Sequence, residues 1–181
     1  GENLVNARHL FGFGYVITAT FISLIVREDP NLAGMAEFVW LIVGLTAAPS
    51  ILVWNAVARH IGGARAIALA CILQAFGVAL SVLGSGLWAM ASAAGLLGAT
   101  FMGITALGLM QARRLSSGDP SRILAAMTAS FGVGQVIGPW VAGQLHAVTG
   151  NFQTASLAAS GALVAAAGLA LFSRRPATAA V

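Results

Sequence analysis

Hydrogen-bonding side chains interrupt several long apolar runs of this sequence. Tyr15 and Thr18 stand three residues apart, so on a helix they share one face. Thr46, Thr105 and Gln135 each interrupt a different apolar run. In lipid such groups are costly unless a partner or water satisfies them, and they often mark the path of a transported solute. These five residues are therefore the candidates for binding a small polar molecule.

The hydroxyl groups among them also have a purely local interpretation. A threonine hydroxyl often bonds back to a carbonyl of its own helix, and this alternative stays open for Thr18, Thr46 and Thr105. Tyr15 and Gln135 are the stronger candidates, because their polar ends reach beyond the helix backbone and need a partner elsewhere.

The sequence contains no pattern typical of metal binding, dinucleotide binding or catalysis. No cluster of His, Cys, Asp and Glu has the spacing of a metal site, and Gly12-Phe13-Gly14 does not follow a strand as a dinucleotide loop would. We therefore expect no metal and no cofactor. Ser160 has no histidine placed to activate it, so we expect no catalytic residues and no enzyme. The net charge of +4 comes from arginines spread between apolar blocks, which argues against a nucleic-acid partner.

The apolar runs themselves indicate the class of protein. Hydrophobic residues make up 59% of the 181 residues and charged residues 8%, whereas soluble chains carry about 45–50% and about 25%. No Asp, Glu, Lys or Arg occurs in 66–112 or 123–173, and each stretch is about twice the ~20 residues that cross a bilayer as a helix. The runs do not alternate in polarity as barrel strands do. We predict an all-α membrane protein in a lipid bilayer.

Breaks in the apolar runs divide the chain into six predicted transmembrane helices. Charge and proline end the first helix at Arg27–Pro30, and Gly84–Gly86 separates the third from the fourth. Ser116–Pro120 and Gly150–Asn151 bound the fifth. The domain covers 1–173, with spans at about 9–26, 37–58, 66–83, 87–111, 123–148 and 152–172, and 174–181 form a short tail.

The arginines set the expected orientation. With six spans, every arginine except Arg27 falls on one side, and acidic residues outnumber Arg27 on the other side. Short arginine-rich loops stay in the cytoplasm, so we predict that both termini are cytoplasmic. This assignment places Arg8 before the first span and leaves no charged residue at mid-membrane depth. The arginines on the predicted cytoplasmic side are Arg8, Arg59, Arg65, Arg113, Arg114, Arg122, Arg174 and Arg175.

Two glycine-containing motifs stand out. Gly134 and Gly138 lie four residues apart on one helical face, where small residues let membrane helices approach closely. Pro139 removes a backbone hydrogen bond and bends the helix, and Gly143 follows it. The second motif runs from Asn55 to Arg65, and its simplest interpretation is a tight basic turn. Its marked residues are Arg59, His60, Gly62 and Arg65.

At these two motifs the sequence resembles the major facilitator superfamily (MFS) of secondary transporters. The loop pattern of that family is G-x-x-x-D-[RK]-x-G-[RK]-[RK], and Gly62 matches its second glycine with His60 at a basic position. Asn55 and Arg59 replace the leading glycine and the aspartate, a degraded match that is usual in C-terminal halves.

Two further segments carry the resemblance. The segment 134–143 looks like the Gly-Pro motif in the fifth helix of a half, and 12–15 with the following 18–21 and 27–28 resembles the YbfB/YjiJ branch of bacterial members. The resemblance implies the C-terminal six-helix half of an MFS bundle, built from two inverted three-helix repeats, in a bacterial inner membrane.

The resemblance also implies a division of roles. The first, second, fourth and fifth spans should border a central cavity, while the third and sixth face outward, so Gln74 on the third should form an interhelical hydrogen bond. The cavity face needs a partner, either an N-terminal six-helix half or a second copy. A proton-binding group, if the carrier uses one, should lie in that other half.

Two functions are compatible with these patterns. The first is a transporter half that moves an unidentified small solute by alternating access. The second is a six-helix membrane scaffold or assembly protein without transport activity, whose glycines serve only packing. Convergence of Tyr15, Thr18, Thr105 and Gln135 on one concave surface would favour the transporter.

Overall fold

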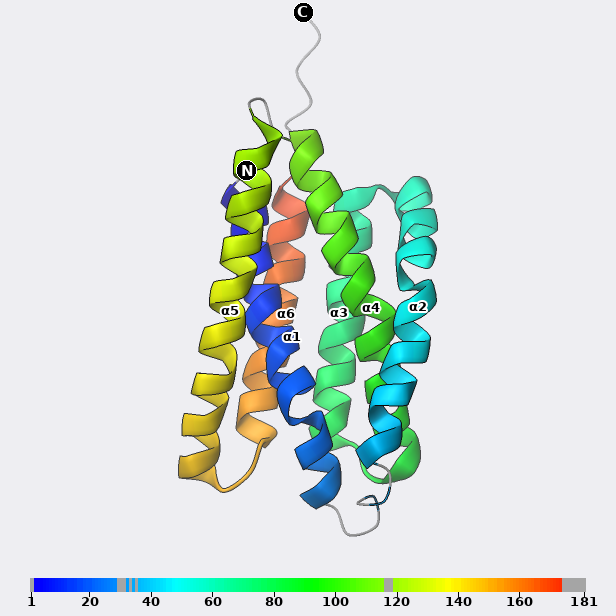
Figure 1. Ribbon diagram of the computed structural model, residues 1–181, viewed down its shortest axis with the longest axis vertical. Coiled ribbons are helices and arrows are strands. Elements are labelled where there is room, and N and C mark those ends of the chain that lie inside the picture. The colour runs from blue at the N-terminus through cyan, green and yellow to red at the C-terminus, as the bar shows by residue number, and fades with distance from the viewer. Residues whose placement is uncertain (1, 29–31, 33, 35, 116–118, 174–181) are drawn as a thin grey trace, which may run out of the picture.

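The computed structural model describes residues 2–28, 32, 34, 36–115 and 119–173, which form an antiparallel bundle of six helices and no strand (Figure 1). All six are long and apolar enough to cross a membrane, which confirms the predicted all-α transmembrane fold. The start of α1 and the end of α6 lie at the same end of the bundle (Figure 1). The helices are α1 (Glu2–Glu28), α2 (Ala36–Ile61), α3 (Gly63–Leu83), α4 (Gly86–Leu115), α5 (Pro120–Thr149) and α6 (Gln153–Phe172).

The helix ends follow from residues with capping and turn chemistry. Asp119 caps α5, because its carboxylate accepts a hydrogen bond of 2.8 Å from the backbone N–H of Ser121. Gly62 alone separates α2 from α3, and Gly150 ends α5. Their φ values of 87° and 73° favour glycine. The tail 174–181, with Arg174 and Arg175, and the loop residues 116–118 lie outside the described residues.

The first helix begins earlier than the predicted span. α1 starts at Glu2 rather than near residue 9, so Arg8 lies within the first helix and not ahead of it. A hydropathy pattern registers only the lipid-matched part of a helix, whereas hydrogen bonding continues through Asn3 and Asn6 at its polar start. Arg8 consequently lies about 9 Å along the helix axis from Glu2.

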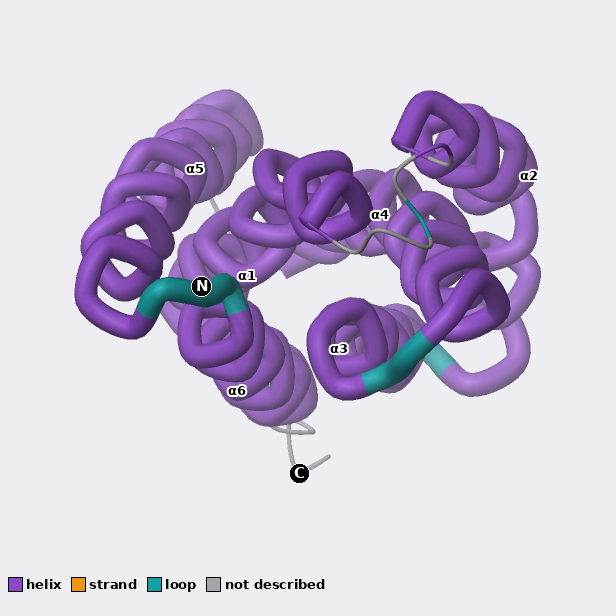
Figure 2. The backbone as a smooth tube through the Cα atoms, turned by 90° about the horizontal axis from the view of Figure 1, so that it is seen from below, coloured by secondary structure: helices purple, strands orange, loops and turns teal. Residues whose placement is uncertain are grey.

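The packing of the helices has an internal symmetry. α1 packs along α5 and α6, α4 packs along α2 and α3, and α3 packs on α6. Exchanging α1, α2 and α3 for α4, α5 and α6 reproduces the same set of contacts, as predicted for two three-helix repeats. Figure 2 shows α2 and α5 on the two flanks of the bundle, with α1 and α4 between them.

The equivalent helices α2 and α5 are the least buried of the six. Only 22% and 17% of the apolar windows of α2 and α5 are buried, against 56% and 50% for α3 and α4. The interior between α3 and α6 is rich in buried alanine, which allows close approach. Gln74 is fully buried on α3, and its side-chain oxygen accepts a 3.0 Å hydrogen bond from the Thr100 hydroxyl on α4, so the predicted interhelical hydrogen bond is confirmed.

Candidate functional site

One face of α1 carries a continuous row of polar and aromatic side chains. Arg8, Phe11, Tyr15 and Thr18 follow one another at intervals of three or four residues, which places them on a common helical face. All but the half-buried Tyr15 are buried. The Thr18 hydroxyl has no hydrogen-bond partner among the described residues. This row faces the interior of the bundle.

Four stacked rings join α1 to α4 and α5, and we call Phe11, Tyr15, Phe101 and Phe131 the aromatic cluster. The Tyr15 and Phe101 ring centroids are 4.4 Å apart with an interplanar angle of 15°. The Tyr15–Phe131 and Phe11–Phe131 centroid distances are both 5.7 Å. Stacked aromatic rings at such distances attract one another beyond the effect of their buried area. The cluster therefore holds three helices together at the level of Tyr15.

The two strongest sequence candidates meet at this cluster. The polar ends of Tyr15 on α1 and Gln135 on α5 approach each other and interact. Each residue is half-buried, so the pair is partly open at the surface of the six helices. The pair lies one helical turn along α5 from Phe131.

Arg8 is a functional candidate that the sequence patterns missed. Its side chain is 6% exposed, and its guanidinium carbon lies 4.5 Å from the ring centroid of Phe131 and 5.7 Å from that of Phe11. These are cation–π distances. Its Nε and Nη1 atoms are buried without a hydrogen-bond partner among the described residues. A signal was available in the sequence, since Phe11 and Tyr15 follow Arg8 at helical spacing.

Thr105 approaches the same place from α4. Its hydroxyl oxygen is buried and has no partner among the described residues, not even a carbonyl of its own helix. Phe101 and Gly108 lie four and three residues from Thr105 and share its face. A side chain at Gly108 would stand 3.9 Å from Cδ and Nη1 of Arg8. Thr105 thus lies between the aromatic cluster and Arg8.

Thr46 is not part of this group. Its hydroxyl donates to the carbonyl oxygens of Ile42 and Val43 at 2.9 and 3.1 Å, which is the local bonding left open for threonines. It lies on α2, facing Gly98 of α4. The structure therefore brings together Tyr15, Gln135 and Thr105 around α1, and leaves Thr46 at a separate interface.

Glycines make the contact between α1 and α5, and we call Gly12, Gly134 and Gly138 the α1–α5 seam. A Cβ atom at Gly134 would stand 2.5 Å from the carbonyl oxygen of His9, and one at Gly12 would stand 2.5 Å from that of Phe131. Real Cβ atoms do not approach backbone so closely, so these positions require glycine. Pro139 is half-buried next to the seam.

Gly143 differs from the other glycines of the predicted motif. A Cβ atom there would meet nothing within 4 Å, so Gly143 takes no part in packing within these six helices. The close approach of α1 and α5 depends on Gly134 and Gly138 instead.

The arrangement agrees with comparison to known proteins. The model of the family described as the uncharacterised MFS-type transporter YbfB matches residues 3–171, from the first turn of α1 to the last turn of α6. The chain belongs to this MFS family. The match confirms the resemblance to the superfamily and to its YbfB branch. No curated protein matches the chain.

The basic turn of this MFS chain lies between α2 and α3. Arg59, His60 and Arg65 are exposed there, around the positive φ of Gly62. A cleft of about 310 Å³ opens nearby between α2, α3 and α4, and Gln111 lines it together with Arg59. A Cβ atom at Gly63 would stand 2.8 Å from the side-chain oxygen of Gln111.

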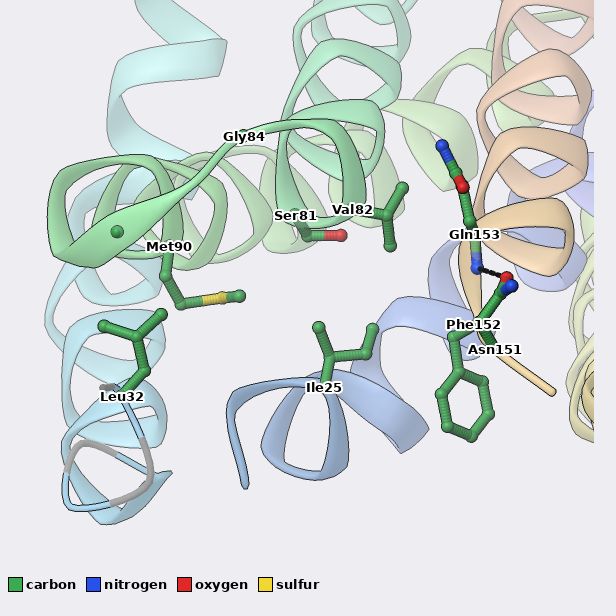
Figure 3. Close-up of a pocket in the computed structure, with 10 residues that line it drawn as sticks. Ile25, Leu32, Ser81, Val82, Gly84, Met90, Asn151, Phe152 and Gln153 are labelled. Carbon is green, nitrogen blue, oxygen red and sulfur yellow. Dashed lines mark hydrogen bonds between the residues drawn. The ribbon is translucent and has the colours of Figure 1, made fainter. Parts of the chain in front are cut away.

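A second cavity of about 310 Å³ lies at the other end of the bundle, where the α3–α4 and α5–α6 connections meet the end of α1 (Figure 3). Ile25 and Met90 supply apolar walls. The polar groups at its edge are used locally: the Ser81 hydroxyl donates to Val78 at 2.7 Å, and the Asn151 side chain accepts from the backbone N–H of Gln153 at 3.0 Å. A third, smaller cavity is lined by Arg8, whose Nε and Nη1 atoms have no partner among the described residues.

Among the described residues, no three His, Cys, Asp or Glu side chains gather as a metal site would require.

Proposed function

We propose that this chain is one six-helix half of a secondary carrier that moves a small solute across the membrane by alternating access. Membership of the MFS transporter family supports this function. The observation that carries it is the convergence of Arg8, Tyr15, Thr105 and Gln135 on one aromatic cluster between α1, α4 and α5. A scaffold protein has no need to leave buried polar groups unpaired, because each costs folding free energy.

The helix packing suits rocking motions of the kind that alternating access requires. Secondary carriers of this type expose a midplane site to each side in turn by rigid-body movement of one repeat against another. In the α1–α5 seam, the backbones touch with no side chain between them at Gly12 and Gly134. Such a contact allows the helices to slide or tilt without repacking large side chains.

We infer that a second six-helix unit completes the carrier, either an N-terminal half encoded upstream or a second copy. The flanking helices support this, because α2 and α5 carry large exposed apolar side chains such as Leu52 (75% exposed) and Val136 (75%). Lipid covers part of such a surface, and a partner half covers the remainder in a twelve-helix carrier. The apolar flanks and the half-buried Tyr15–Gln135 pair would then border one shared cavity.

We also propose a bacterial inner-membrane location with the start of α1 and the end of α6 in the cytoplasm. Arg59, Arg65, Arg113 and Arg122 flank the ends of α2–α5 at the same end of the bundle as the start of α1, whereas Arg27 flanks the opposite end. This asymmetry is the one that keeps arginine-rich ends in the cytoplasm.

The test is solute uptake into proteoliposomes that contain the full-length product of the reading frame. A panel of radiolabelled metabolites is offered to the wild type and to two matched variants of α5. Gln135→Leu removes the partner of Tyr15 and should lower uptake, whereas Gln144→Leu changes an exposed residue of the same helix and should not. The scaffold function would instead be supported by two results together. The folded wild type would take up no solute of the panel, and cells that lack the gene would grow normally on every metabolite.

A further inference from the structure

We propose that the carried solute is a small organic anion whose acid group pairs with Arg8 and whose apolar body lies against the aromatic cluster. This inference rests on the proposed carrier function and adds the chemical class of its substrate. It starts from the state of Arg8, because a guanidinium group carries five N–H donors and remains charged at any physiological pH.

Arg8 lacks the anion that a buried cation requires. Its side chain is 6% exposed, and Nε and Nη1 have no acceptor among the described residues. Burying a charge is costly unless it is paired. The two aromatic rings replace only part of the hydration free energy that the guanidinium loses on burial. An acceptor that arrives with the solute would satisfy these donors only when the carrier is loaded.

The acidic side chains that the structure describes are occupied or remote. The Asp119 carboxylate accepts a hydrogen bond from the backbone of Ser121 as the cap of α5. Glu37 is exposed in the first turn of α2, at the end of the bundle opposite to the start of α1. Neither therefore neutralises Arg8.

The surroundings of Arg8 fit one acid group rather than several. The cavity that Arg8 lines with Phe11, Cys71 and Gly108 has a volume of about 10 Å³, near the space of one water molecule. This space therefore admits one small polar group of a solute at most. Thr105 lies one helical turn from Gly108 on α4, and its hydroxyl has no partner among the described residues, so it is a further donor that the sequence of α4 offers.

The remaining contacts indicate an organic body. Tyr15, Phe101 and Phe131 are half-buried, so their rings are partly exposed beside Arg8. Ring faces bind apolar or planar groups and bind hydrated inorganic anions poorly. The Tyr15–Gln135 pair adds one polar contact at the far side of the cluster. A monocarboxylate with an apolar or aromatic body fits this combination.

The experiment compares acids with their neutral amides on the full-length carrier. Binding of labelled monocarboxylates and of the matching carboxamides is measured on purified protein, and uptake of the same pairs is measured in proteoliposomes. The wild type should prefer at least one acid to its amide by about tenfold or more. Arg8→Gln should remove that preference, Arg8→Lys should retain part of it, and Arg122→Gln, at an exposed arginine of α5, should leave it unchanged.

The outcomes separate this inference from the carrier function. Amides that bind as well as their acids, or a preference that survives in Arg8→Gln, would overturn the anion assignment while leaving transport intact. Loss of all binding in a folded Arg8→Gln protein, amides included, would also overturn it, because Arg8 would then pair with an acidic residue of the other half. Acid binding that depends on Arg8 but without uptake would support the anion assignment and contradict the carrier.

Discussion

The α1–α5 and α2–α4 interfaces occupy equivalent places in the two repeats, yet their buried polar groups are hydrogen-bonded to different extents. At α2–α4, the Ser50 hydroxyl donates to the carbonyl of Ala99 at 2.7 Å and accepts from the backbone N–H of Gly103 at 3.0 Å. Trp54 donates to the same Ala99 carbonyl at 2.7 Å. At α1–α5, the Ser130 hydroxyl donates to the carbonyl of Val5 at 2.9 Å, but Arg8 of α1 keeps two buried nitrogen atoms without a partner among the described residues.

The difference is the basis on which we propose binding at one interface and not at the other. The α2–α4 interface is closed by its own hydrogen bonds, so nothing remains there for a ligand to satisfy. Both interfaces use glycine for close approach, at Gly98 and Gly103 on one side and at Gly134 and Gly138 on the other. The two interfaces therefore share glycine packing and differ in how far their buried polar groups are hydrogen-bonded.

The largest effect is expected from breaking the α1–α5 seam. In Gly138→Leu, a Cβ atom would stand 2.6 Å from Cγ1 of Val16 and 3.0 Å from the carbonyl oxygen of Phe13, so α1 and α5 must separate. Overpacking of this kind costs about 1–3 kcal/mol, and we expect uptake to be abolished. Gly143→Leu is the matched control, because its Cβ atom meets nothing within 4 Å. Normal initial uptake rates by the Gly138 variant would contradict the packing role.

The next largest effect is expected from removing the hydroxyl group of Tyr15. Tyr15→Phe keeps the ring that stacks on Phe101 at 4.4 Å and removes only the hydroxyl that interacts with Gln135. One hydrogen bond corresponds to about a three- to tenfold loss in uptake at limiting solute. Tyr15→Leu also loses the ring stacking, so its uptake should be lower than that of Tyr15→Phe. Equal uptake by wild type and Tyr15→Phe would exclude the hydroxyl from the binding site.

At the closed interface we expect a loss of stability and little loss of transport. Ser50→Ala removes a donor to Ala99 and an acceptor for Gly103, so the free energy of unfolding in mixed micelles should fall by about 1–2 kcal/mol. Uptake measured at a temperature where the variant is folded should change less than about twofold. A large loss of uptake at unchanged stability would place binding at α2–α4 and reverse the comparison.

The smallest effect is expected at Thr46. Its hydroxyl bonds only to carbonyls of its own helix, so Thr46→Val should change stability by about 0.5 kcal/mol or less and leave uptake unaltered. The same substitution at Thr105, whose hydroxyl is unpaired, should lower solute affinity. Similar affinities for the two variants would show that the unpaired hydroxyl has no role in binding.

The helices of this protein were predictable because lipid imposes a simple rule on the chain. Apolar length and the breaks at Gly84–Gly86 and Gly150–Asn151 suffice to place six spans. The true start of α1 was not predictable in this way, because a helix continues into polar sequence wherever its backbone stays hydrogen-bonded. That extension is what places Arg8 within α1.

The site was predictable only for residues with distinctive chemistry. Tyr15 and Gln135 were found because their polar ends need partners beyond their own helices. Phe11, Phe101 and Phe131 were missed, since a phenylalanine in an apolar run carries no signal of its own. Nothing local distinguishes Thr46 from Thr105 either: the difference lies in which neighbouring helix each one meets, and that depends on tertiary packing.

Solute protection of a single thiol tests most directly whether the carried solute occupies the space between α1, α4 and α5. Thr105→Cys is made in the full-length carrier without its other cysteines, Cys71 included, and its labelling by a maleimide is followed with and without a solute found by the uptake panel. At ten times Kd, the solute should slow labelling of Thr105→Cys about tenfold and leave a cysteine at Val148, 86% exposed at the end of α5, unaffected. Equal labelling of Thr105→Cys with and without the solute would contradict the account.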